Sequence, residues 1–156
     1  PIFHFMRAII QRVSFSQVEV EGELIGEIPH GLMVLLGITH SDTEKDIDWI
    51  IRKVVNMRIF NDEIGKMNLS VQDIKGGIQV ISQFTLFAET QKGNRPSYLR
   101  SAPPNISEPL YERFVQKLKL VFDGPVATGK FGAYMQVSLL NDGPVTILLD
   151  SHQPNL

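Results

Sequence analysis

The chain has 156 residues, 43% of them hydrophobic, and a formal net charge of −2. This length predicts one domain with a sizeable core, and the charge gives no general attraction to nucleic acid, so a polyanionic partner requires a local cluster of basic residues. No apolar run is long enough to cross a bilayer and no secretory leader opens the chain, so we expect no membrane association. The absence of cysteine excludes disulfides and thiolate chemistry and fits a reducing, cytoplasmic location.

Five residues precede Met6, which we interpret as the natural start of the protein. Residues 1–5 are then a remnant added ahead of it, and residues 6–156 form a single domain. No long repeat divides this stretch. The tetrapeptide Asp-Gly-Pro-Val occurs at both 123–126 and 142–145, and ordinary turn chemistry accounts for the repetition.

The first part of the chain is predicted to form strands. Residues 6–13 are mainly apolar with polar residues interspersed, which predicts a strand. Residues 17–21 and 23–28 alternate again and are separated by Gly22, a pattern typical of a hairpin with a tight turn. Residues 31–39 are almost continuously apolar, which predicts a central strand covered on both faces.

The first helix is predicted over residues 42–57. Ser41 and Glu44 have the spacing of a capping box, with the hydroxyl first and the glutamate three positions later. Isoleucine and valine then recur at helical spacing, at positions 47, 50, 51, 54 and 55. Residues 58–70 mix apolar and turn residues, which predicts only a short strand or a loop.

A long polar segment, residues 87–105, lies between a predicted strand at 77–81 and the second helix. A connection of this length in a compact domain is more often functional or mobile than idle. Ser107 is placed to cap the second helix, with Pro109 in its first turn. The Gly-Pro pair at 124–125 ends that helix.

Two further strands, 135–140 and 145–149, are predicted near the C-terminus, joined by a turn over 141–144. The total is six or seven strands and two helices. The early hairpin and the single crossover helix indicate an α/β fold: a single-domain mixed β-sheet, curled towards a barrel, with the two main helices on one side.

The most informative stretch is residues 82–86, Ser-Gln-Phe-Thr-Leu, which places two hydroxyls and an amide at a strand end. No Gly-x-Ser-x-Gly elbow marks a hydrolase nucleophile, and His40 and His152 are more simply exposed loop residues than bases for Ser82 or Thr85. In a structural interpretation, the hydroxyls of Ser82 and Thr85 form hydrogen bonds with backbone groups at the strand end. In a functional one, backbone N–H groups at a kinked strand end stabilise an oxyanion, while the substrate itself orients water.

Other common kinds of site are absent from the sequence. The four histidines have no helical partner at metal-binding spacing. There is no Gly-rich phosphate loop of either common kind. We therefore expect no metal and no cofactor.

Two further segments each have an ordinary and a functional interpretation. The Gly143-Pro144 pair is ordinarily a trans turn, because only about 5–6% of X-Pro bonds in folded proteins are cis. The basic residues Lys92, Arg95 and Arg100 lie in or near the long polar segment. They form either a solvated loop or a phosphate-contacting rim around a pocket for a nucleotide end.

Taken together, these motifs resemble the D-aminoacyl-tRNA deacylase family over nearly the whole chain from Met6. Each piece alone is weak, but five pieces in this order at compatible spacing are specific. They are Met-Arg-Ala (6–8) with Gln-Arg-Val (11–13), Ser-Gln-Phe-Thr-Leu (82–86), Gly-Asn-Arg-Pro-Ser (93–97), Phe-Gly-Ala (131–133) with Met135 and Val137, and Asn-Asp-Gly-Pro-Val-Thr (141–146). Tyr134 departs from the pattern, which has an acidic or other polar residue after Gly-Ala. We expect this departure to alter the rim of the pocket and to leave the two central motifs unchanged.

The resemblance implies a homodimeric enzyme that hydrolyses the ester between a D-amino acid and the terminal adenosine of tRNA. It also implies removal of glycine from non-cognate tRNA. Gly143-Pro144 is then cis and reaches into the partner subunit's pocket, where its carbonyls bind the substrate amino group and leave no room for an L side chain. Arg12 holds this turn, and Phe131 and Met135 complete the substrate site.

The resemblance places catalysis at the strand-end motif. The expected catalytic residues are Ser82, Gln83, Phe84 and Thr85. In this scheme the N–H groups of Phe84 and Thr85 stabilise the oxyanion, the Thr85 side chain only positions, and the adenosine 2′-hydroxyl assists hydrolysis. The expected tRNA contacts are Lys92, Asn94 and Arg95. Two alternatives stay open: a different small-ester hydrolase on the same fold, and a non-catalytic nucleic-acid-binding dimer.

Overall fold

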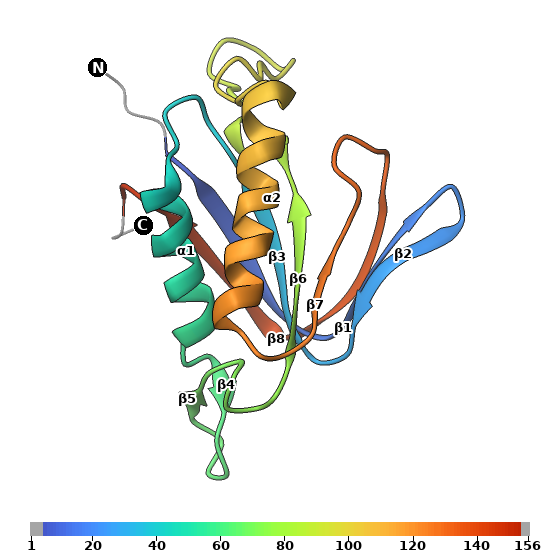
Figure 1. The fold of residues 1–156 in the computed structure, drawn as a ribbon, viewed down its shortest axis with the longest axis vertical. Coiled ribbons are helices and arrows are strands. Elements are labelled where there is room, and N and C mark those ends of the chain that lie inside the picture. The colour runs from blue at the N-terminus through green and yellow to red at the C-terminus, as the bar shows by residue number, and fades with distance from the viewer. Residues whose placement is uncertain (1–4, 154–156) are drawn as a thin grey trace.

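The computed structural model describes residues 5–153 as a curled mixed sheet with two α-helices across one of its faces (Figure 1). This confirms the predicted α/β fold. Residues 1–4 of the expected remnant at 1–5 lie outside the described residues. The elements are β1 Arg7–Val20, β2 Glu23–Ile28, β3 Gly31–Gly37, α1 Glu44–Asn56, β4 Phe60–Asn61, β5 Met67–Leu69, β6 Gly77–Ser82, the 3-10 helix η1 Phe84–Phe87, α2 Pro104–Val121, β7 Val126–Thr128 and β8 Gln136–Asp150. No helix among them is long and apolar enough to span a membrane.

The central position of β3 is confirmed. It pairs antiparallel with β1 and parallel with β6, and the strand order is β2-β1-β3-β6-β7, with β8 on the other edge of β1. The hairpin of β1 and β2 is also confirmed. Its turn residues Glu21 and Gly22 both have positive φ, 51° and 79°, as two-residue hairpin turns that match the twist of the strands require.

The C-terminal prediction of two strands joined by a turn is wrong. Residues 136–150 form one strand that stays paired with β1, where Gln11 is opposite Thr146 and Val13 is opposite Asn141. A step of two residues along β1, from 11 to 13, therefore corresponds to a step of five along β8, from 146 to 141. The extra residues of β8 bulge out of the pairing. The long β1 offers one continuous partner edge, so the chain resumes pairing after the bulge and does not fold back.

Both predicted helix caps are also wrong. Helix α1 is capped by Thr43 with Asp46, and Ser41 precedes this capping box. Helix α2 begins at Pro104, whose fixed φ and missing N–H suit the first helical position. Ser107 lies inside α2, where its hydroxyl donates to the Pro103 carbonyl at 3.1 Å.

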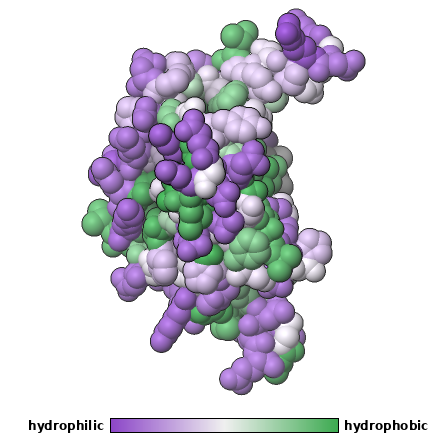
Figure 2. Space-filling model, turned by 90° about the vertical axis from the view of Figure 1, so that its right-hand side faces the viewer, coloured by the Kyte–Doolittle hydropathy of each residue, from purple (hydrophilic) through white to green (hydrophobic). Residues whose placement is uncertain are grey.

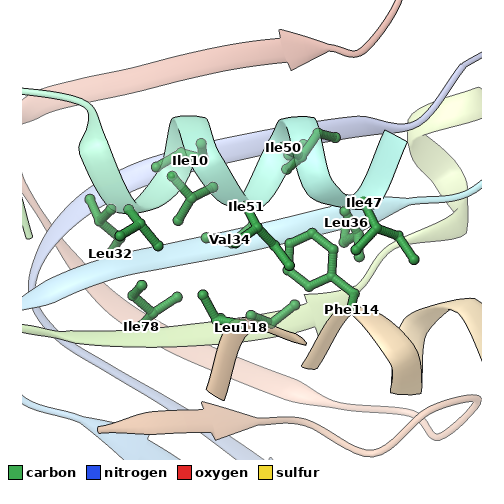
Figure 3. Packing of buried hydrophobic residues seen from close by; sticks show 14 of the residues in the cluster. Ile10, Leu32, Val34, Leu36, Ile47, Ile50, Ile51, Ile78, Phe114 and Leu118 are labelled. Carbon is green, nitrogen blue, oxygen red and sulfur yellow. The ribbon is translucent and has the colours of Figure 1, made fainter. Parts of the chain in front are cut away.

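The main core lies between the helices and the sheet (Figure 3). Ile47 and Ile50 of α1 and Phe114 and Leu118 of α2 are fully buried. They pack over the apolar side chains of the central strands, which include Ile10, Leu32, Val34, Leu36 and Ile78. Burying each such side chain contributes about 1.5–3 kcal/mol, so this layer holds both helices on the sheet.

Gln79 of β6 draws the two ends of the sheet together. Its buried amide donates to the carbonyl of Gly26 on β2 at 2.9 Å and to that of Thr128 on β7 at 3.1 Å. The Ser16 hydroxyl donates to the amide oxygen at 2.6 Å. A Cβ at Gly26 would lie 2.5 Å from the Thr128 oxygen, so the two strands approach at a distance that only glycine allows. The sheet is therefore nearly closed into a barrel.

Replacing Gln79 with leucine is expected to lower the free energy of unfolding by about 2–4 kcal/mol, because two partly buried carbonyls and the buried Ser16 hydroxyl lose their partner. Urea unfolding measures this loss. Gln136→Leu, at an exposed position, is the matched control and should change stability by no more than about 0.5 kcal/mol. Equal stability of the two variants would contradict the closing role of Gln79.

Asp42 is a buried carboxyl group ahead of α1. Its Oδ2 accepts from the Thr39 N–H at 2.8 Å, whereas its buried Oδ1 has no partner among the described residues. Burial raises the pKa of Asp42 from 3.8 to about 7, and the nearby charges of Asp46 and Asp150 act in the same direction. The native state therefore binds more protons at Asp42 than the unfolded state does between these two pH values.

The contribution of Asp42 to the free energy of unfolding should fall as pH rises from about 4 to about 7 and then level off. Asp42→Asn removes this titration, so its stability relative to the wild type should increase over the same range. Urea unfolding at a series of pH values tests this, with Glu63→Gln in the exposed hairpin of β4 and β5 as control. A constant difference between Asp42→Asn and the wild type would contradict the raised pKa.

Candidate active site

A pocket of about 590 Å³ opens at the carboxyl ends of β3 and β6. One wall is the strand end and η1, a second is the first turn of α2, and a third is the segment before β8. The lining residues are Leu36, Ile38, Ile81, Ser82, Gln83, Phe84, Tyr98, Ser101, Ala102, Pro103, Pro104, Ser107, Phe131, Gly132, Ala133, Tyr134, Met135 and Val137. This volume is in the range of small-molecule sites.

The pocket brings together five of the residues that the sequence nominated: Ser82, Gln83, Phe84, Phe131 and Met135. Aspartate, glutamate, histidine, lysine and arginine are all absent from the described lining. A general base from these side chains is therefore not at hand, and the polar groups available are hydroxyls, one side-chain amide and the backbone.

Two backbone N–H groups at the start of η1 are unpaired. The N–H of Gln83 donates to the Leu36 carbonyl at 2.8 Å, and that of Leu86 donates to Gln83 at 3.4 Å. Between them, the N–H groups of Phe84 and Thr85 donate to no acceptor in the described part of the chain, as expected for the first turn of a helix. Adjacent free N–H groups of this kind can stabilise a developing oxyanion.

The Thr85 side chain is hydrogen-bonded to the side chain of Gln83. Its hydroxyl oxygen accepts a short hydrogen bond from the Gln83 amide, and Thr85 does not line the pocket. Arg7, which the sequence did not nominate, supports the same turn: it donates to the Leu86 carbonyl at 3.1 Å and pairs with Asp150 at 3.1 Å. Its sequence signals are a charge on a mainly apolar strand and its place in the Met-Arg-Ala motif of residues 6–8.

The Gly143-Pro144 bond is cis, as the resemblance implies. Both residues are exposed on the bulge of β8 and neither lines the pocket of the same chain. The Asn141 side chain accepts from the Val145 N–H at 2.9 Å and closes the bulge across its base. The bulge is therefore a projecting, hydrogen-bonded loop on an edge strand.

Arg12 holds this bulge from the side of β1. Its Nε donates to the Asp142 carbonyl and its Nη1 donates to the Ile59 carbonyl, both at 2.8 Å. The side chain is buried, with 7% of its surface exposed. Arg12 thus ties together β1, the bulge and the segment that leads into β4, and it is not in the pocket.

The remaining nominated residues lie outside the pocket. Lys92, Asn94 and Arg95 are exposed in the long loop. His40 contacts the Leu99 carbonyl at 2.9 Å and His152 contacts Asp46 at 2.8 Å, so neither is bonded to the hydroxyl of Ser82 or Thr85. No group of three or more potential metal ligands occurs in the part of the chain that the structure describes.

A family model described as D-Tyr-tRNA(Tyr) deacylase matches residues 9–150. Relatives named D-aminoacyl-tRNA deacylase from Thermosipho africanus and Flavobacterium johnsoniae are each 56% identical over 94% of this chain and 97% of their own length. A solved structure named c-Myc DNA unwinding element binding protein is 43% identical, with a TM-score of 0.88 over 92% of this chain and 97% of its own.

A second solved structure, of a probable eukaryotic D-amino acid tRNA deacylase, has a TM-score of 0.80 over 93% of this chain and 98% of its own. At 16% identity it supports the fold alone. The family model and the curated relatives cover nearly the whole chain and agree on one activity, ester hydrolysis on aminoacyl-tRNA. The chain therefore belongs to the D-Tyr-tRNA(Tyr) deacylase family, whose members act on D-aminoacyl-tRNA.

Proposed function

We propose that the pocket binds the terminal adenosine of D-aminoacyl-tRNA with its ester, and that the N–H groups of Phe84 and Thr85 stabilise the oxyanion during hydrolysis. The observation that carries this is the pair of unpaired N–H groups beside a pocket without titrating acids or bases. Preorganised donors of this kind are often the largest single contribution to acyl-transfer catalysis.

The nucleophile is water, and the substrate assists it. Water adds to the ester carbonyl carbon, and the ester C–O bond to the ribose then breaks as the ribose oxygen takes up a proton. The adenosine 2′-hydroxyl lies next to this bond and relays the proton, which suits a pocket whose described lining holds no carboxylate or imidazole. The products are the free D-amino acid and tRNA.

Chiral selection comes from the partner subunit's Gly143-Pro144. In a homodimer, this exposed bulge enters the pocket of the other subunit, binds the amino group through its backbone carbonyls and blocks the space of an L side chain. Its hydrogen bonds to Arg12 and Asn141 keep it stiff, and a stiff wall rejects a side chain more strongly than a pliable pocket does. Glycine passes because it has no side chain to reject.

The free edge of β8 supports the homodimer. Among the described strands β8 pairs only with β1, which leaves its other edge open. Leu140 and Leu148 on β8 and Phe15 on β1 are 55%, 44% and 41% exposed. Figure 2 shows hydrophobic residues among hydrophilic ones on one side of the molecule. Long edge strands with exposed apolar residues favour association.

The acceptor end of the tRNA follows the long loop on its way to the pocket. Lys92, Asn94 and Arg95 are exposed there and supply donors for phosphate oxygens. Because the formal net charge is −2, attraction depends on this local group and should weaken with salt. The substrate also fits a cytoplasmic location, where tRNA is charged.

Deacylation of D-tyrosyl-tRNA and L-tyrosyl-tRNA by the purified protein, in the presence of a metal chelator, tests the proposal. We expect release of the D form to be at least about 100-fold faster than that of the L form, because a rigid wall discriminates more than side-chain affinity does. Equal release of both forms would contradict the proposed role of Gly143-Pro144 in excluding L side chains. Binding of tRNA with no release would favour a non-catalytic nucleic-acid-binding protein.

Thr85→Ala is expected to retain at least about a tenth of the wild-type kcat, because the hydroxyl is bonded to Gln83 and lies off the pocket lining, whereas loss of an essential nucleophile costs roughly 10⁴-fold or more. Single-turnover deacylation of D-tyrosyl-tRNA measures it. Thr90→Ala, at an exposed position in the loop, is the control. Complete loss in a folded Thr85→Ala protein would make Thr85 the nucleophile.

Gly143→Ala is expected to lower kcat/KM for D-tyrosyl-tRNA at least about tenfold and to cost about 1–3 kcal/mol of stability. Gly143 has φ of +154°, and an added Cβ would lie 2.5 Å from the Val145 nitrogen, so the bulge has to move. Gly65 also has a positive φ, but a Cβ added there would meet no atom within 4 Å. Gly65→Ala is therefore the matched control. Unchanged rates on both D and L substrates would count against the wall.

A further inference from the structure

Tyr134 is a strongly exposed aromatic residue in the lining of the pocket. Burial alternates along this segment: Phe131, Ala133 and Met135 are half-buried, whereas Gly132 and Tyr134 are exposed. The Tyr134 side chain is 85% exposed although the residue contributes to the pocket lining. Most of its ring is therefore open to solvent at the rim of the pocket.

The segment that carries Tyr134 is a defined turn. The N–H of Ala133 donates to the Lys130 carbonyl at 3.1 Å, and the N–H of Lys130 contacts the Met135 sulfur at 3.4 Å. Gly132, with φ of +75°, makes the reversal possible. The turn thus fixes the backbone of Tyr134 at the rim of the pocket.

The other aromatic residues that line the pocket already have partners. The rings of Phe84 and Tyr98 meet edge to face at 5.1 Å, and Phe131 lies 5.9 Å from the ring of Tyr111. Within the part of the chain that the structure describes, Tyr134 has no hydrogen bond and no ring contact. Phe84 and Tyr98 are also exposed, at 56% and 40%, but their rings contact each other. Tyr134 is the most exposed aromatic residue of this lining and the one without a ring contact among the described residues.

We propose that Tyr134 stacks on the base of the nucleotide that precedes the terminal adenosine. This rests on the proposed function, in which the pocket holds that adenosine and its ester. The strand then leaves the pocket across the rim, so the next base comes to lie outside, where the ring is exposed. Unpaired bases of single-stranded ends are commonly held by aromatic stacking, and every base has a face to offer.

The test compares two substrates, D-tyrosyl-adenosine and its extension by one nucleotide, the D-tyrosyl ester of cytidylyl-adenosine. The readout is the gain in kcat/KM that the added cytidine brings. Wild type, Tyr134→Phe and Tyr134→Leu are compared, since phenylalanine keeps the stacking face and leucine keeps bulk without it. Leu120→Ala, at an exposed position on α2 outside this pocket, is the control.

Stacking of one base predicts that Tyr134→Leu reduces this gain about tenfold, chiefly through KM, while Tyr134→Phe and Leu120→Ala preserve it. An unchanged gain in Tyr134→Leu overturns the proposal. Equal loss on both substrates also overturns it, because the ring then serves the adenosine or the amino acid. Sedimentation at the assay concentration accompanies the kinetics, and a change of oligomeric state in Tyr134→Leu reassigns the ring to an interface.

A different result separates failure of the proposed function from failure of this inference. If the wild type hydrolyses neither ester nor D-tyrosyl-tRNA, the pocket assignment is wrong and the stacking role falls with it. If the wild type hydrolyses all three and only the cytidine gain is insensitive to Tyr134, the deacylase stands and the stacking role alone is wrong.

Discussion

The buried guanidinium of Arg12 is the interaction on which the proposed chemistry depends. Removing a charged group from water is costly unless its donors are bonded, and here they reach the carbonyls of Asp142 and Ile59. The same bonds fix the bulge that carries Gly143-Pro144. A wall that rejects a side chain by contact has to be rigid, because a pliable wall yields and selectivity is lost. The buried charge of Arg12 therefore lies beside the bulge that, in the proposed mechanism, has to be rigid.

The pocket offers backbone dipoles where many hydrolases offer titrating side chains. Ser82 and Gln83 are the polar side chains of the motif at 82–86 that line the pocket, and the unpaired donors are the N–H groups of Phe84 and Thr85. Backbone groups are placed by the fold and do not depend on rotamers or protonation. In the proposed function, such a site contacts the ester and the α-carbon, which all D-aminoacyl-tRNAs share, and therefore accepts many amino acids.

Strand β6 links the stability of the barrel to this site. Gln79 in its middle draws β2 and β7 together, and Ser82 at its end begins the motif at 82–86 that lines the pocket. The Tyr111 hydroxyl of α2 donates to the Val80 carbonyl at 2.7 Å, which ties the helix that forms the opposite wall to the same strand. The distance between the two walls is therefore set by buried hydrogen bonds as well as by apolar packing.

Local pattern alone determined the central strand β3, the strand that ends at residue 82, the Glu21-Gly22 turn and the approximate spans of the two helices, because each depends on neighbouring residues and their periodicity. Helix caps and strand continuity could not be predicted in this way. The tetrapeptide Asp-Gly-Pro-Val makes the limit plain: at 123–126 it leads from α2 into β7, whereas at 142–145 it is the bulge with the one cis bond found among the described residues. The second copy is held by Arg12, 130 positions away in the sequence. Only the tertiary structure decided this difference, since the partners that fix the bulge are brought there by the pairing of β1 with β8.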